Sequence, residues 1–229
     1  MVITVFSIIV LILSIIIHEY SHALMAYKLG DDTAKSLGRL TLNPLPHIDL
    51  VGSVLLPLFF VFSGSNFMVA WAKPVPYNPN KIKDKKYGDL KVAIAGPLSN
   101  FAVAIFFGLV TRLLPLSQLS KINLLSSFLM GDFSSLAVFI SNDIISSIFI
   151  LSLLFCFYNL LLGIFNLLPI PPLDGSKVIA NFLPEKLRYK LFSIEGYGIF
   201  IILILAFLGF FQLLFRPILF SLFFLLGIN

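Results

Sequence analysis

An almost unbroken apolar segment runs from the first residue to residue 29, and it contains the motif His-Glu-Tyr-Ser-His at residues 18–22. The segment is long enough to cross a membrane as a helix. On a helix, His18 and His22 lie one turn apart on the same face. Burying two histidines and an acid in lipid costs free energy, so such groups indicate a functional site. The motif therefore predicts a metal site within a membrane, with Glu19 beside it as general base.

A structural alternative is a polar patch that binds a neighbouring helix, or histidines that are satisfied by backbone carbonyls. The whole chain contains only three histidines, and two of them fall in this motif. Three ionisable groups within five buried residues are expensive without a metal ion. The metal site is therefore the preferred interpretation.

The composition predicts an all-α polytopic membrane protein and a single integral-membrane domain over residues 1–229. The chain is 59% hydrophobic and 12% charged, whereas about a quarter of the residues in a soluble domain are charged. The first apolar segment lacks a basic start and a small-residue cleavage site, which is typical of a retained helix. The net charge of +5 does not indicate nucleic-acid binding, because basic residues in membrane proteins usually mark cytoplasmic loops. The one cysteine, Cys156, excludes an intramolecular disulfide and a cysteine-based metal site.

The hydropathy pattern predicts a bundle of about five to six membrane segments. We expect spanning helices over residues 2–29, 90–114, 144–167 and 191–214, with a short last span or re-entrant piece over residues 218–228. The apolar run at residues 50–62 is too short to span comfortably and contains Pro57, which favours a re-entrant loop. Between these segments we expect a loop over residues 115–132, an interfacial segment just before residue 144, and a short helix starting at Ser176.

Residues 36–42 alternate in polarity and are followed by Asn-Pro, which predicts a short membrane-associated β element. An edge strand at this place could hold an unwound substrate segment extended. The alternative is an inert surface hairpin.

The distribution of basic residues predicts the orientation in the membrane. If residues 50–70 enter and leave on one side, thirteen of the sixteen Lys and Arg residues share one face, and only Arg112, Lys121 and Arg216 lie on the other. Such a bias marks the cytoplasmic side. The re-entrant topology would also place the histidine motif and the segment around Asp174 at the same depth, toward the cytoplasm.

A catalytic zinc ion usually takes three protein ligands and keeps a further position for water. With His47 set aside, a carboxylate is the expected third ligand beside the two histidines. Asp174 is the best candidate, because it follows a proline-rich break at the end of a spanning helix and precedes Gly175, which permits close backbone approach. The alternative for Asp174 is an N-cap of the following helix.

With these features the chain resembles the site-2 protease family of intramembrane zinc metalloproteases. Within that family it resembles the compact prokaryotic branch, which lacks PDZ and CBS domains. The resemblance rests on the motif at residues 18–22, on Ala-Gly-Pro at residues 95–97 with Asn100, and on Asn-Leu-Leu-Pro-Ile-Pro-Pro-Leu-Asp-Gly at residues 166–175. It extends through Gly-Arg-Leu-Thr-Leu-Asn-Pro at residues 38–44 and Trp-Ala-Lys-Pro-Val-Pro at residues 71–76. In many relatives two glycines follow the aspartate, whereas Gly175 precedes a serine here.

The resemblance implies one zinc ion per chain, held by His18, His22 and Asp174, with Glu19 as catalytic base. It also implies that Asn166 helps to position the substrate backbone. Asn166, Asn100 and His47 are candidate donors to the oxyanion. For Asn100 the alternative is a hydrogen bond between membrane helices, and for His47 it is a loop hydrogen bond.

The sequence thus predicts an intramembrane zinc metalloendopeptidase that cleaves transmembrane proteins or remnant signal peptides in the plasma membrane of a prokaryote. The predicted partners are transmembrane substrates and the lipid bilayer, and nucleic acid is not expected to be a partner. One competing class is a transporter with an intramembrane ion path, but we find no paired repeats. Another is an inactive relative that sequesters peptides, which the intact Glu19 argues against.

Overall fold

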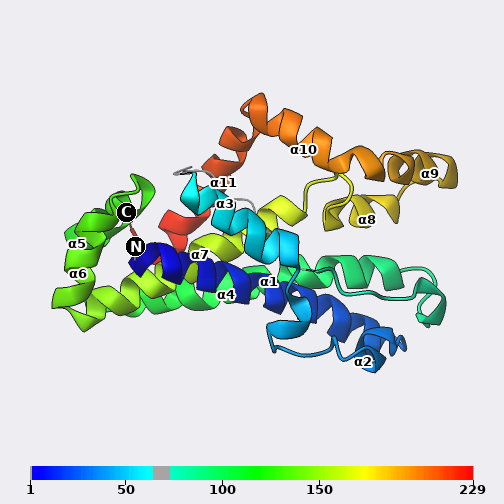
Figure 1. Cartoon of the computed structure of the whole chain (residues 1–229), viewed down its shortest axis with the longest axis horizontal. Helices are drawn as coiled ribbons and strands as arrows, with labels where there is room; N and C mark the ends of the chain where they lie inside the picture. The colour runs from blue at the N-terminus through cyan, green and yellow to red at the C-terminus, as the bar shows by residue number, and fades with distance from the viewer. Residues whose placement is uncertain (1, 64–72, 229) are drawn as a thin grey trace. The chain divides into compact units, whose positions relative to one another are not determined.

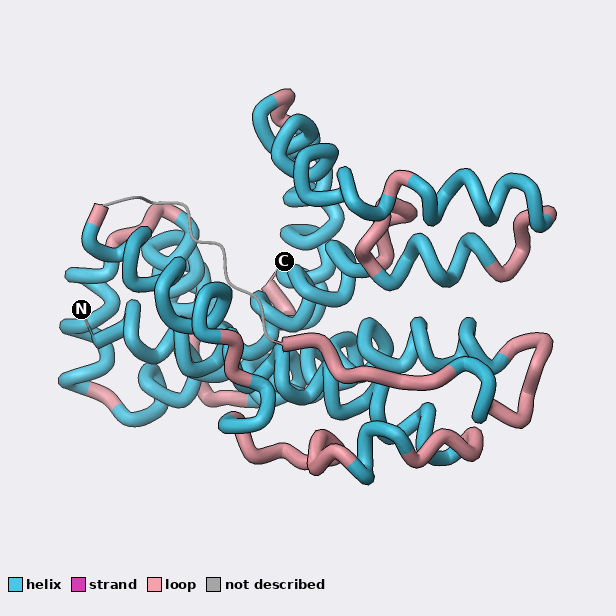
Figure 2. The backbone as a smooth tube through the Cα atoms, turned by 45° about the vertical axis from the view of Figure 1, so that its right-hand side comes forward, coloured by secondary structure: helices cyan, strands magenta, loops and turns pink. Residues whose placement is uncertain are grey.

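The computed structural model describes residues 2–63 and 73–228, which form helices joined by loops (Figures 1 and 2). In chain order the α-helices are α1 (Val2–Lys28), α2 (Thr33–Ser36), α3 (Leu56–Phe62), α4 (Gly88–Leu113), α5 (Gln118–Leu129), α6 (Phe133–Asn142), α7 (Ile144–Asn166), α8 (Asp174–Ala180), α9 (Glu185–Ser193), α10 (Gly198–Phe207) and α11 (Phe210–Leu226). Shorter helical turns are the 3₁₀ segments η1 (Leu45–His47), η3 (Pro79–Lys81) and η4 (Glu195–Tyr197) and the π-helical segment η2 (Leu50–Leu55).

Among the residues that the structure describes, three helices are long and apolar enough to cross a membrane: Ile3–Lys28, Gly88–Leu113 and Ile144–Asn166. They agree with three of the predicted spans. α1 ends at Lys28, and Gly30 follows with a φ of +106°, a left-handed conformation typical of a glycine after a helix. The predicted break before residue 144 is confirmed, because Asp143 separates α6 from α7; an interfacial position of α6 stays a prediction.

The predicted span over residues 191–214 is wrong as one continuous helix. The segment contains the end of α9, the turn η4 and the ten-residue α10, and then a break at Gly209 before α11. Gly209 has a φ of +77°, a left-handed conformation that ends helical geometry and suits glycine. The predicted loop over residues 115–132 is wrong as well. Most of it forms α5, whose first turn is capped by the Ser117 hydroxyl.

The predicted strand over residues 36–42 is wrong, because the described chain, with its gap at residues 64–72, contains no strand. Ser36 is the last residue of α2, and Gly38 then turns the chain with a φ of +67°. Of the predicted re-entrant segment, residues 50–62 form η2 and α3, whereas residues 64–70 lie outside the described residues.

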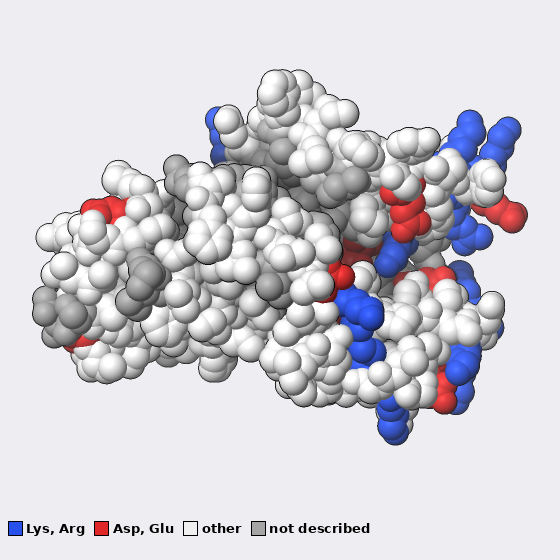
Figure 3. All heavy atoms as spheres, in the orientation of Figure 1, with Lys and Arg blue, Asp and Glu red and all other residues white. Residues whose placement is uncertain are grey.

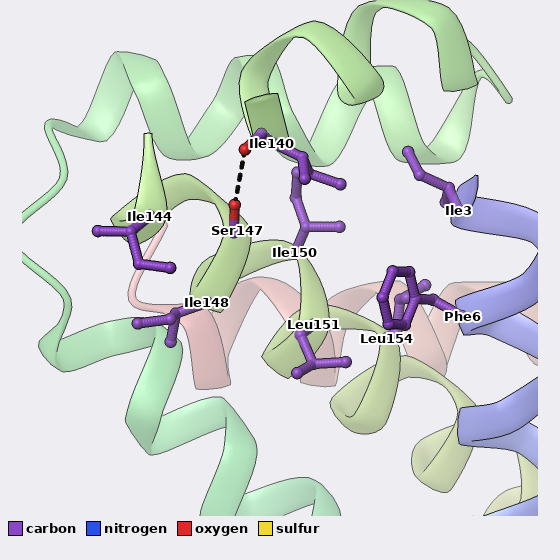
Figure 4. Close-up of a pocket in the computed structure, with 9 residues that line it drawn as sticks. All are labelled: Ile3, Phe6, Ile140, Ile144, Ser147, Ile148, Ile150, Leu151 and Leu154. Carbon is purple, nitrogen blue, oxygen red and sulfur yellow. Dashed lines mark hydrogen bonds between the residues drawn. The ribbon is translucent and has the colours of Figure 1, made fainter. Parts of the chain in front are cut away.

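The chain divides into two compact units. Unit 1 comprises Met1–Leu11, Asn100–Phe165 and Leu203–Asn229, and its buried core contains Phe149, Leu153 and Leu222. Within it, the Asn100 side-chain amide donates to Oδ1 of Asn159 at 2.7 Å, which joins α4 to α7. An apolar cavity of about 210 Å³ in this unit is lined mainly by residues of α1, α6 and α7 (Figure 4).

Unit 2 comprises Ile12–Ser99 and Asn166–Ile202. A small core of Ala26, Ile82 and Val92 joins the end of α1 to the start of α4. Thirteen of the sixteen Lys and Arg residues belong to this unit, and many are visible around α2 and α9 in Figure 3. Unit 2 therefore contains both the histidine motif and most of the basic residues.

Candidate metal centre

The two histidines of the motif lie on α1, one helical turn apart, as predicted. Their Nε2 atoms are 3.0 Å apart, and the ring planes are nearly perpendicular, at 83°. Nδ1 of His22 lies 2.7 Å from the backbone carbonyl oxygen of Val92 on α4. In the neutral tautomer this Nδ1–H donates to the carbonyl, so Nε2 keeps a lone pair for a ligand bond.

Asp174 joins this pair from a segment more than 150 residues away. One of its oxygens, Oδ2, lies 3.0 Å from Nε2 of His18 and 3.1 Å from Nε2 of His22. Asp174 is the first residue of α8, and Leu173 occupies the cap position. The N-cap alternative for Asp174 is therefore wrong. Gly175 is needed for this approach, because a Cβ atom there would overlap the carbonyl group of Leu167.

The three side chains form one compact donor set, whose ligand atoms all lie within 4.8 Å of one another. Two imidazole nitrogens and one carboxylate oxygen are typical of catalytic zinc sites. The surroundings also fit an ion. A Cβ atom on Gly96 of α4 would overlap Nε2 of His22 and would lie 2.6 Å from Nε2 of His18. Only a glycine at this position lets α4 approach both imidazoles this closely.

Glu19 lies next to His18 on α1 and is half-buried. Its Oε2 atom accepts a hydrogen bond from the backbone N–H of Val75 at 2.8 Å. The residue predicted as general base is thus held by the main chain of a segment that follows the undescribed residues 64–72.

Charge around the cluster favours an ionised carboxylate. Burial alone would raise the pKa of Asp174, but the contacts of its carboxylate with the His18 and His22 imidazoles outweigh burial and hold the pKa well below its usual range. The ammonium group of Lys177 lies 4.0 Å from Oδ1 of Asp174, the oxygen that does not face the imidazoles.

Burial, with the nearby negative charges of Asp89 and Asp174, raises the pKa of Tyr77 to about 12.

The three residues predicted as further donors lie in different surroundings. Asn100 is fully buried and bonded to Asn159 within unit 1, which favours a helix–helix hydrogen bond. His47 is buried, and its Nε2 lies 2.9 Å from the carbonyl oxygen of Thr41, which favours the loop hydrogen bond. Asn166 is the last residue of α7. A contact of these three residues with substrate stays a prediction.

Sequence reasoning did not name Val75, Gly96 or Lys177 as site residues. Gly96 and Val75 belong to the segments that carry the family resemblance, but a glycine and a backbone amide give no chemical signature of their own. Lys177 lies one helical turn after Asp174, a spacing that places both side chains on one face of α8. This spacing is the signal that could have identified Lys177.

Comparison with known proteins agrees with this geometry. The model of peptidase family M50 matches residues 6–211. The protein called "Putative zinc metalloprotease YwhC" of Bacillus subtilis is 37% identical over 200 residues, which cover 87% of this chain and 79% of that protein. "Putative zinc metalloprotease Rip2" of Mycolicibacterium smegmatis is 25% identical over 85% of this chain and 63% of its own length.

A third relative is zinc metalloprotease MJ0392 of Methanocaldococcus jannaschii, which is 29% identical over 79% of this chain and 35% of its own length. The chain therefore spans less than two thirds of the mycobacterial and archaeal relatives. No solved structure matches the chain significantly.

Proposed function

Because the chain belongs to peptidase family M50, the family of site-2 zinc metalloproteases, we propose that it hydrolyses peptide bonds within or near transmembrane segments of membrane-anchored substrates. The observation that carries the proposal is the convergence of His18, His22 and Asp174 in unit 2. Two of these groups lie on a helix long enough to span a membrane. Two metal donors inside a spanning helix suit a peptide bond that is itself buried in lipid.

In this proposal His18, His22 and Asp174 hold one zinc ion. Zinc, when bound, supplies a Lewis acid that activates water and polarises the scissile carbonyl. Glu19 accepts the proton of the attacking water and delivers it to the leaving amine. The hydrogen bond from His22 to Val92 keeps the imidazole in the tautomer and orientation that a ligand needs.

We also propose that all 229 residues act as one metalloprotease domain in a prokaryotic plasma membrane, with the site toward the cytoplasm and a re-entrant segment at residues 50–70. The thirteen basic residues of unit 2, against three in unit 1, support this orientation. The further membrane segments of the proposed five to six would come from the apolar pieces around α3, α10 and α11.

Ligand substitution tests the proposal. Purified wild type, His22→Ala and Asp174→Ala are compared for zinc content and for cleavage of a reporter with one transmembrane segment. We expect one zinc per wild-type chain, and loss of both zinc and cleavage in either variant. A chelator should abolish wild-type cleavage, and added zinc should restore it. If Asp174→Ala kept full zinc and full cleavage, the proposed ligand set would be wrong.

A further inference from the structure

An extended segment of unit 2, residues 73–78, runs past the proposed base and is fixed along its length. We call it the strap. Near its middle, the N–H of Val75 donates to Oε2 of Glu19 at 2.8 Å. No helix or strand is assigned to the strap, so its position depends on the side chains and loops that bind it.

The first end of the strap is held by a buried arginine and a loop. Nη2 of Arg39 donates to the carbonyl oxygen of Lys73 at 2.6 Å and to that of Pro74 at 3.3 Å. The N–H of Lys73 in turn donates to the carbonyl oxygen of His47 at 2.9 Å. Arg39 is only 7% exposed, and its hydrogen bonds to the strap offset part of the free-energy cost of burying a guanidinium.

The other end is held by a buried aspartate. Oδ2 of Asp31 accepts from the N–H of Asn78 at 2.6 Å, and Oδ1 accepts from the backbone N–H of Thr33 at 3.0 Å. Asp31 has no exposed surface. Buried charges of opposite sign therefore fix the two ends of one short segment, and the bond to Glu19 lies between them.

The sequence of the strap limits which backbone groups can donate. Pro74 and Pro76 have no N–H and have restricted φ angles. Val75 is therefore the only donor between the two prolines. Such a pattern stiffens the chain and directs one N–H group toward one carboxylate oxygen.

We propose that the strap is a positioning element of the protease: the Val75 N–H holds one oxygen of Glu19, so that the other oxygen faces the reaction, and Arg39 and Asp31 act through the strap. This inference rests on the proposed function, in which Glu19 is the general base. A fixed base loses less entropy on reaching the transition state than a mobile one. Arg39 and Asp31 are positioning residues, because neither touches the donor set directly.

The opposite role would be a latch that keeps the base engaged until substrate displaces the strap. The two roles predict opposite signs. Weakening a positioning contact lowers kcat, whereas weakening a latch raises it.

The test removes the Val75 N–H donor in the whole 229-residue chain, reconstituted in bilayers with a transmembrane reporter. Replacement of Val75 by its α-hydroxy acid turns the N–H into an ester oxygen and keeps the side chain. Val75→Pro removes the same donor with natural residues, and Val75→Ala keeps it while shortening the side chain. Zinc content, kcat and KM are measured for each, with Glu19→Gln in parallel.

We expect the ester and Val75→Pro to lower kcat about tenfold to a hundredfold, the range for losing a hydrogen bond to a charged group. KM and the one bound zinc should stay near wild type, and Val75→Ala should recover kcat to within about threefold. Arg39→Met should lower kcat too, but should add little to the ester variant, because both changes act through the same bond.

If the ester variant had a wild-type or higher kcat and Glu19→Gln were inactive, the positioning role would be overturned. Full additivity of Arg39→Met and the ester would also overturn it, because Arg39 would then not act through Val75. Activity in Glu19→Gln would instead contradict the proposed function itself.

Discussion

The backbone of Gly96 on α4 lies against the imidazole of His22 on α1, and a Cβ atom at position 96 would overlap Nε2 of that ring. Nε2 is also the nitrogen that faces Asp174. Helix α1 therefore supplies two of the three donors, and the backbone of its neighbour α4 packs directly against both imidazoles. The arrangement of the two imidazoles thus depends on a residue that contributes no side chain.

Gly96→Ala should consequently reduce zinc binding by at least tenfold, since the added methyl group would occupy the space beside both Nε2 atoms. Zinc content after dialysis against a graded chelator measures this. Gly196→Ala is the matched control, because a Cβ atom at position 196 would meet no atom within 4 Å. If both variants bound zinc like wild type, α4 would not border the metal site in this way.

The pKa of Asp31 predicts a dependence of stability on pH. Burial would raise this pKa, but hydrogen bonds from Thr33 and from the N–H of Asn78, with the charge of Lys81, hold it below its usual value. The ionised form is thus favoured in the folded state. Its contribution is fully present above about pH 4 and is lost as pH falls through the lowered folded-state pKa.

Asp31→Asn should therefore lower the free energy of unfolding at pH 7 by about 1–3 kcal/mol, because buried donors lose their charged acceptor. The variant should also lose less stability than wild type between pH 5 and pH 3. Thermal unfolding of the purified protein at several pH values measures both effects. Equal pH dependence in the two proteins would show that Asp31 is not the titrating group.

The hydrogen bond between Asn100 and Asn159 should contribute to the stability of the fold and should not affect zinc binding. Asn159→Leu leaves the buried Asn100 amide without this acceptor, which should cost about 1–3 kcal/mol. Zinc content should be unchanged. Asn100→Leu in the Asn159→Leu background should cost less than in the wild type. A selective loss of kcat in stable Asn100→Leu protein would instead favour the oxyanion role.

The proposed topology predicts which positions can be labelled from each side of the membrane. In a Cys156→Ala background, cysteines replacing Lys35 and Lys83 should react from the cytoplasmic side, and one replacing Asn123 from the other side. All three positions are exposed. Opposite accessibility of positions 35 and 83 would refute the re-entrant segment.

The spanning helices and the metal cluster could be predicted because their signals are local. The length of α1, the break at Asp143 between α6 and α7, and the one-turn spacing of the histidines can all be read from neighbouring residues. Asp174 was predictable because a proline break and a glycine placed a carboxylate at the end of a membrane helix.

The wrong predictions concern segments whose secondary structure depends on packing and cannot be read from the local sequence pattern alone. Alternating polarity at residues 36–42 favours a strand, but a strand needs a partner, and the described chain places Ser36 in a helix instead. The apolar run at residues 191–214 is continuous in composition, yet Gly209 adopts a left-handed conformation that composition does not reveal. The strap contact was unpredictable, because Val75 binds Glu19 through its backbone.

The central claim is that this protein is a zinc peptidase that uses Glu19 as its base and cleaves a bond within the membrane. Identifying the cleaved bond tests this claim most directly. Wild type and Glu19→Gln are reconstituted in bilayers with the transmembrane reporter, zinc is quantified, and the products are identified by mass spectrometry. We predict cleavage within or beside the transmembrane segment by wild type. We predict that Glu19→Gln holds one zinc per chain and cleaves at least a thousandfold more slowly, because the attacking water loses its base. Glu19→Gln with full zinc and a tenth or more of wild-type activity would contradict the account.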